Sequence, residues 1–327
     1  MDVKLLLKRG ALLAAANWPL IAIQFAAETT FQVLLAVPVI GGAILVAAIL
    51  GGNVSNLLQG RVRDMAATVA SSLTAEPIAL VSFMTAFGIV LAGGSMLVFL
   101  VKGGVIEVLL KANSDTGPIE REPLTLHGVQ GASRFSLSRF TGGCARLFKA
   151  YTMLGLYLTG VYVLTGALYV VGAVYTFDLL GTGGLFVVVW APVTLLLLVW
   201  ISFVNVVYAL LQLVIAAENV GIHEGLRIIG GFVRARIRPL GALLIVVFLL
   251  LSGAWVVSIL AWSGVGLVAF VPLVGLAVFP LQIVALLMRG LVYEYIGLTA
   301  LGAYLSLYRP EAGDARASER GTAPATA

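Results

Sequence analysis

Three polar side chains lie four residues apart in the first long apolar stretch of the sequence: Gln24, Glu28 and Gln32. Residues at this spacing share one face of a helix. A carboxylate on such a face can bind a proton or a cation inside a polar cavity. The same side chains can instead hydrogen-bond to neighbouring helices, or Glu28 can lie close enough to the outer membrane edge to be hydrated. The sequence leaves these three interpretations open.

Later apolar stretches repeat the pattern at a spacing of seven. Asn205, Gln212 and Asn219 follow one another at this interval, and so do Gln282 and Arg289. Side chains seven residues apart return to nearly the same helix face. The candidate intramembrane polar site therefore consists of Gln24, Glu28, Gln32, Asn205, Gln212 and Gln282.

Basic residues gather in two amphipathic stretches, within GGCARLFKAY and EGLRIIGGFVRARIRPLGALL. Helices of this kind lie in the membrane interface, with the apolar side toward acyl chains and the arginines toward anionic headgroups. The candidate headgroup-binding residues are Arg227, Arg234, Arg236, Arg238, Arg146 and Lys149. The alternative is that these charges only orient the chain in the membrane and attract anionic lipid loosely.

Catalytic motifs do not stand out. His127 and His223 have no second ligand at metal-binding spacing, and Cys144 is the only cysteine, which excludes an intrachain disulfide. The sequence contains no HExxH motif, no Ser/His/Asp arrangement and no phosphate-binding loop. We therefore predict a protein that is not an enzyme and that needs no metal or cofactor.

The composition predicts the elements that carry these residues. The chain is 61% hydrophobic and 11% charged, whereas soluble domains are nearer half apolar and a quarter charged. A bilayer core needs about 20 apolar residues of helix. Six runs are long enough, at 18–50, 77–101, 150–177, 184–217, 239–262 and 265–288. The sequence thus predicts an all-α, polytopic transmembrane bundle over 1–308 and a disordered cytoplasmic tail at 309–327.

The distribution of charge predicts the orientation of the bundle. The run 18–50 contains Pro38 and is long for one span, so it is one kinked helix, a span followed by a half-helix, or two full crossings. If it crosses the membrane once, every Lys and Arg except Arg61 and Arg63 lies on the same side. Basic loops stay on the cytoplasmic side. We therefore expect both termini in the cytoplasm and a multi-pass location in a bacterial-type inner (plasma) membrane.

Three stretches, beginning at Gly10, Gly143 and Gly230, share a layout in which a glycine and a short amphipathic segment precede a membrane span. This layout predicts a duplication of three helix pairs, each introduced by an interfacial helix.

The same stretches carry a family resemblance. EGLRIIGGFVRARIRPLGALL, KRGALLAAANWPLIAIQF and FSLSRFTGGCARLFKAYTMLGLYL resemble the interfacial-helix signatures of six-span bacterial proteins related to the membrane domain of glycerophosphodiester phosphodiesterases. The resemblance covers most of 1–308 and implies a six-helix fold in the inner membrane. It implies no enzyme, because in bifunctional relatives the phosphodiesterase is a separate soluble domain.

These observations favour a non-catalytic membrane module that organises partner proteins or lipids. The expected partners are the lipid bilayer, anionic phospholipid headgroups and a membrane protein. Nucleic acid is not expected, since the net charge of +5 comes from short basic loops between apolar runs. The alternative is a transporter of ions, lipids or small molecules that uses the polar stripe around Glu28, and a membrane-embedded enzyme is a third option.

Overall fold

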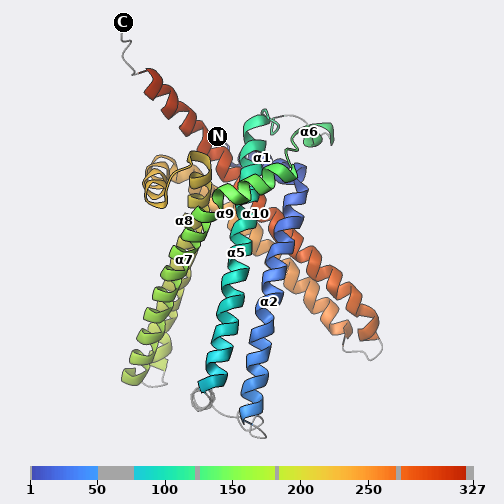
Figure 1. Cartoon of the computed structure of the whole chain (residues 1–327), viewed down its shortest axis with the longest axis vertical. Helices are drawn as coiled ribbons and strands as arrows, with labels where there is room; N and C mark the ends of the chain where they lie inside the picture. Colours follow the sequence, from blue (N-terminus) through green and yellow to red (C-terminus); the bar gives the residue numbers. More distant parts are fainter. Residues whose placement is uncertain (1, 51–76, 122–125, 181–183, 270–273, 322–327) are drawn as a thin grey trace. The chain divides into compact units, whose positions relative to one another are not determined.

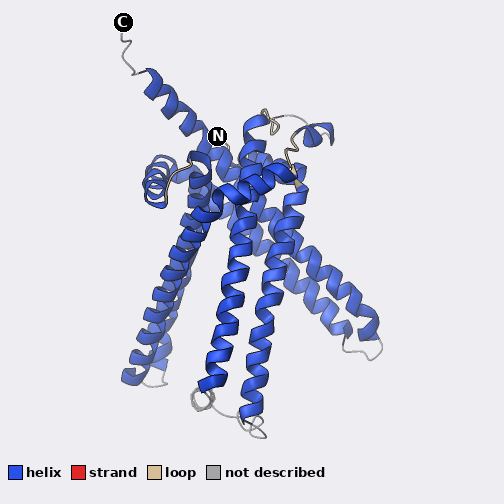
Figure 2. Ribbon diagram, viewed as in Figure 1, coloured by secondary structure: helices blue, strands red, loops and turns tan. Residues whose placement is uncertain are grey.

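The structure is a computed structural model that describes residues 2–50, 77–121, 126–180, 184–269 and 274–321. In this part of the chain every regular element is a helix (Figure 2). The helices are α1 (Val3–Ala16), α2 (Trp18–Leu50), α5 (Pro77–Asp115), α6 (Leu126–Gly131), α7 (Leu137–Leu180), α8 (Gly184–Glu218), α9 (Ile222–Ala269) and α10 (Val274–Gly321), labelled in Figure 1.

Six of these helices are long and apolar enough to cross a bilayer. Their candidate spans are Trp18–Gly42, Leu80–Asp115, Leu137–Leu180, Gly184–Glu218, Ile222–Ala261 and Pro280–Tyr308. The predicted all-α fold with six membrane-spanning helices is therefore confirmed, and the chain has the architecture of a multi-pass membrane protein.

Several helix boundaries differ from the sequence prediction. The stretch 18–50 is one continuous helix, α2, with Pro38 inside it, so a separate half-helix is excluded. The predicted division near Gly264 lies within α9, which continues to Ala269, because glycine is well tolerated in membrane helices. The sixth span consequently begins later, in α10.

Over part of the predicted disordered tail at 309–327, α10 continues as helix to Gly321. The stretch is rich in Ala, Glu and Arg, which have high helix propensity. Residues 322–327 lie outside the described part of the chain.

The described helices fall into two compact units, residues 26–101 and residues 1–25 with 102–327. The smaller unit is a hairpin of the later part of α2 and the first part of α5. A side chain on Gly94 would lie 2.0 Å from the ring of Phe31, and one on Gly42 would lie 2.5 Å from the ring of Phe83. Both glycines therefore leave the space that the phenylalanine rings occupy in this hairpin.

The larger unit has a packed core to which six helices contribute. Its fully buried side chains include Leu6, Leu13, Ile106, Leu109, Leu147, Tyr151, Leu213, Ile215, Leu243, Leu298 and Leu305. These residues belong to α1, the last turns of α5 and α8, the first parts of α7 and α9, and the later part of α10. The core therefore gathers the basic ends of the helices.

Close backbone contacts hold this core together. On α1, a side chain at Gly10 would lie 2.2 Å from the carbonyl oxygen of Thr299 on α10. On α5, Gly103 and Gly104 face Gly143 and Cys144 of α7. Glycine at these contacts lets the helices approach to backbone distance.

The helix α9 consists of two stretches. Arg236 has non-helical backbone angles, φ −126° and ψ 28°, and Pro239 follows three residues later. A proline inside a helix clashes with the carbonyl of the preceding turn and removes a hydrogen bond, which explains a break at this point. The first stretch, Ile222 to Ala235, is the basic amphipathic segment noted in the sequence.

Candidate functional site

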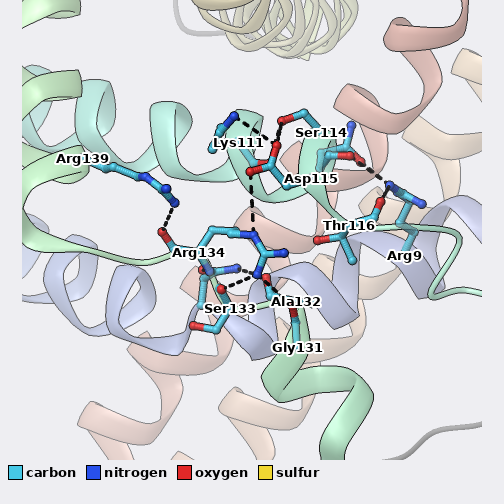
Figure 3. A network of polar contacts seen from close by, with 12 residues as sticks. Arg9, Lys111, Ser114, Asp115, Thr116, Gly131, Ala132, Ser133, Arg134 and Arg139 are labelled. Atoms are coloured by element: carbon cyan, nitrogen blue, oxygen red, sulfur yellow. Dashed lines mark hydrogen bonds and ion pairs between the residues drawn. The ribbon is translucent and has the colours of Figure 1, made fainter.

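The basic end of the larger unit is organised around the Arg9 guanidinium. Its Nε donates to the Oδ1 of Asn113 at 2.8 Å, and Nη2 donates to the backbone carbonyls of Asn113 (3.0 Å) and Thr116 (3.1 Å). Nη1 donates to the carbonyl of Gly117 at 3.1 Å and to Glu120 Oε2 at 2.8 Å. Figure 3 shows Arg9 beside Thr116. These contacts use the full hydrogen-bonding capacity of an arginine.

Arg9 and Glu120 form an ion pair, and both side chains are withdrawn from solvent. The Arg9 side chain is 12% exposed and that of Glu120 is 4% exposed. Asn113 is also buried, and its Oδ1 accepts a further hydrogen bond from Ser306 of α10 at 3.1 Å. The cluster thus joins α1, the end of α5 and α10, and its role is to hold the core together.

A second polar contact ties the segment around α6 to α1. Asn17 is fully buried between α1 and α2. Its Nδ2 donates to the carbonyls of Leu13 (2.9 Å) and Ala132 (3.5 Å), and its Oδ1 accepts the backbone N–H of Arg134 at 2.8 Å. The Arg134 side chain reaches Asp115 at 3.8 Å (Figure 3).

Among the predicted headgroup-binding residues, Arg146 is exposed but its guanidinium is engaged in contacts with other helices. It forms an ion pair with Glu107 of α5 and donates to the carbonyl of Ala216 at 3.3 Å. Ala216 lies in the last turn of α8, where backbone carbonyls lack helical partners and a cation is favourable. Arg146 therefore links three helices, and its guanidinium is less available to a lipid than the sequence suggests.

The other predicted basic residues are accessible. Lys149, Arg227, Arg234 and Arg238 are exposed, and Arg236 at the break in α9 is half-buried. The structure thus leaves a basic surface on the first stretch of α9 and, separately, one exposed lysine on α7.

A polar cavity of about 340 Å³ lies beside Arg146. Its polar lining comprises Glu107, Lys111, Ser114, Arg146, Glu218 and Tyr308. The charges of this lining balance, because it contains two carboxylates, Glu107 and Glu218, and two cations, Lys111 and Arg146. Arg146 pairs with Glu107, Lys111 pairs with Asp115 at 3.1 Å, and the Tyr308 hydroxyl donates a hydrogen bond to Glu218 at 3.3 Å. The cavity presents a balanced surface instead of a site for one sign of charge.

The predicted intramembrane polar residues occupy different environments. On α2, Gln24 is buried, Glu28 is half-buried and Gln32 is exposed. Gln212 of α8 is buried, and Gln282 of α10 is half-buried. The side chains along one predicted stripe therefore range from the protein interior to its surface.

On α8 the structure favours the helix-to-helix interpretation. The Tyr162 hydroxyl of α7 donates to the side-chain Oδ1 of Asn205 at 2.8 Å. At Gln212 the Tyr151 hydroxyl donates to the backbone carbonyl, at 2.8 Å, and the side-chain Nε2 of Gln212 has no hydrogen-bond partner among the described residues. Asn219 lies beyond the end of α8 with a φ of 55° and is therefore not part of the helical stripe. Asparagine tolerates this left-handed conformation at helix ends.

Further contacts along the α7–α8 hairpin were not predicted. Trp200 Nε1 donates to Thr165 Oγ1 at 3.2 Å, and the hydroxyls of Tyr169 and Thr194 lie 2.8 Å apart. The Trp190 ring packs edge-on against Tyr169, with the ring centroids 4.9 Å apart. On α7, Tyr162, Thr165 and Tyr169 lie at intervals of three and four, so helical spacing places them on one face. Spacing within one helix does not identify their partners on α8.

Comparison with known proteins gives no match: no family model, no curated protein and no solved structure matches the chain. The resemblance to the membrane domain of glycerophosphodiester phosphodiesterases stays a prediction.

Proposed function

We propose that this protein is a non-catalytic membrane module that organises anionic lipids and membrane partners at the cytoplasmic face of a bacterial-type inner membrane. The observation that carries the proposal is the exposed basic surface of the first stretch of α9. Arg227 and Arg234 are exposed, whereas Ile229 and Phe232 are buried, at 4% and 5% exposure.

The positions of these residues around the helix explain why the arginines are exposed and the apolar residues are buried. Ile229 and Phe232 share a face with Gly225, where a side chain would lie 2.7 Å from Leu211 of α8. Arg227 and Arg234, seven residues apart, occupy the opposite face. The segment is thus fixed to the protein on one side and presents guanidinium groups on the other.

Apolar side chains next to the basic face fit a position in the membrane interface. Leu226 is 43% exposed and Ile237 is 65% exposed. In an interfacial helix such residues enter the acyl region while nearby arginines bind phosphates. Arginine pairs with phosphate through two parallel N–H···O bonds, and each basic residue near an anionic surface contributes about 1 kcal/mol.

The membrane-spanning hairpins offer a second kind of surface. Leu156, Val163, Leu168 and Leu179 on α7 are each more than half exposed, and so are Leu195 and Leu196 on α8. Such faces are suited to acyl chains or to the helices of a membrane partner. This arrangement supports an organising role for the module.

The orientation is part of the proposal. The Arg9 and Arg146 contacts join the ends of α1, α5, α7 and α8, and Asn17 ties the segment after α6 to them. Because basic segments remain on the cytoplasmic side, we place this core and both termini there.

The test compares lipid enrichment between two triple variants in nanodiscs of mixed phosphatidylglycerol and phosphatidylcholine. Arg227, Arg234 and Arg238 are changed together to Gln, which removes the charge, or to Lys, which keeps it but loses the bidentate geometry. We expect the Gln variant to lose the enrichment of phosphatidylglycerol and the Lys variant to keep part of it. Equal enrichment in the Gln variant and the unaltered protein would refute the proposal.

A further inference from the structure

A groove between α9 and α10 is open in the membrane-spanning part of this hairpin. Its volume is about 370 Å³, within the range of about 300–1,000 Å³ that is typical of ligand sites. Residues on both helices line it, among them Ala254, Ser258, Ala261, Ala285, Arg289 and Tyr293.

Small side chains create the apolar part of the groove. Ala254, Ser258 and Ala261 recur at intervals of four and three on α9, which places them on one helix face. Small residues between membrane helices usually allow the helices to approach closely. Here they face Ala285 across an open cavity, so the space they leave is available to a hydrocarbon chain.

One charged side chain lies at the groove. Arg289 is exposed, and its guanidinium carbon lies 5.7 Å from the centroid of the Tyr293 ring. Within the described residues Arg289 forms no ion pair, and the buried hydroxyl of Tyr293 has no hydrogen-bond partner. An arginine in a membrane span calls for an anionic or polar partner.

The position of Arg289 along α10 fits a lipid phosphate. The Tyr295 hydroxyl of the same helix donates to the carbonyl of Ala11 on α1 at 3.2 Å. Arg289 lies six residues earlier, about 9 Å along the axis at 1.5 Å per residue. An arginine side chain spans much of that distance when it extends toward the headgroups. The groove then leads away from α1, from Arg289 toward Ala261 and Ala285.

We propose that this groove binds one acyl chain of an anionic phospholipid whose phosphate pairs with Arg289. The inference rests on the proposed function, because it takes the α1 end of the hairpin to lie at the membrane interface. It deepens that function by assigning one specific lipid position in addition to the basic surface of α9.

The test counts tightly bound lipids by native mass spectrometry after release from phosphatidylglycerol nanodiscs. The double variant Ser258→Leu/Ala285→Leu fills the groove, and Arg289→Gln removes the phosphate partner. Val256→Leu adds bulk to an exposed position of α9 outside the groove, and Arg139→Gln removes an exposed arginine of α7 outside the candidate lipid-binding residues. We expect one retained phosphatidylglycerol in the unaltered protein and both controls, and its loss in the two groove variants.

A measurement on the unaltered protein keeps the inference testable if the filled variant fails to fold. Glycerol 3-phosphate carries the phosphate without an acyl chain, so it should not displace the retained lipid even at millimolar concentration. Displacement would show a phosphate site and would overturn the acyl-chain groove. Retention of the lipid by a folded Arg289→Gln protein would overturn the pairing with phosphate.

The two proposals fail separately in this design. Changing Arg227, Arg234 and Arg238 to Gln should abolish the general enrichment of phosphatidylglycerol and leave the single retained lipid in place. If the triple variant loses the enrichment while Arg289→Gln retains the lipid, the groove is refuted and the proposed function stands. If Arg289→Gln loses the lipid while the triple variant keeps its enrichment, the basic surface of α9 is refuted and the lipid in the groove stands.

Discussion

Replacing Arg9 with Met should destabilise the protein strongly, although Arg9 lies near the chain terminus. The change removes five hydrogen bonds and leaves the Glu120 carboxylate, which is 4% exposed, without its cation. Removing one partner of a buried ion pair costs about 3–5 kcal/mol in the free energy of unfolding. At about 2 °C or more per kcal/mol, the melting temperature in detergent should fall by about 6 °C or more.

A double-mutant cycle separates the charge pair from the rest of the cluster. Glu120→Gln removes the stranded charge, so the variant Arg9→Met/Glu120→Gln should be more stable than Arg9→Met alone. Lys111→Met is the matched control, because its ion pair with Asp115 lies at the surface and should contribute little. Equal melting temperatures for Arg9→Met and Lys111→Met would show that the buried ion pair of Arg9 and Glu120 does not hold the core together.

Two further predictions concern the contacts of α1. Gly10→Ala places a methyl group 2.2 Å from the Thr299 carbonyl oxygen and should lower the free energy of unfolding by about 1–3 kcal/mol. Gly230→Ala is the control, because a side chain there meets no atom within 4 Å. The melting temperatures of the two variants test the difference. Asn17→Ala leaves the backbone N–H of Arg134 without its acceptor, so hydrogen exchange should accelerate around 132–134 and stay unchanged at the centre of α8. Unchanged exchange at 132–134 would contradict the role given to Asn17.

The six spans could be predicted from the sequence because a membrane helix is a local property. Twenty apolar residues satisfy their own backbone hydrogen bonds and need no tertiary partner to be recognised. The predicted helix boundaries were wrong where the sequence gives only a weak signal for a helix end. Gly264 is a helix breaker in soluble proteins but not in a membrane helix, so α9 continues past it to Ala269.

The polar contacts of the core could not be predicted in the same way. Arg9 and Glu120 are 111 positions apart, and Asn17 and Arg134 are 117 positions apart. Periodicity within one helix carries no information about such pairs. The same limit applies to Arg146, whose sequence context predicts a headgroup contact while the fold places Glu107 beside it.

The most direct test of the proposed function is photo-crosslinking with lipids that carry a reactive group in the head region. The protein is reconstituted with either photoreactive phosphatidylglycerol or photoreactive phosphatidylcholine, and the labelled peptides are identified by mass spectrometry. We predict preferential labelling of the segment 226–238 by phosphatidylglycerol, reduced when Arg227 and Arg234 are changed to Gln. Equal labelling of this segment by the two lipids would contradict the account.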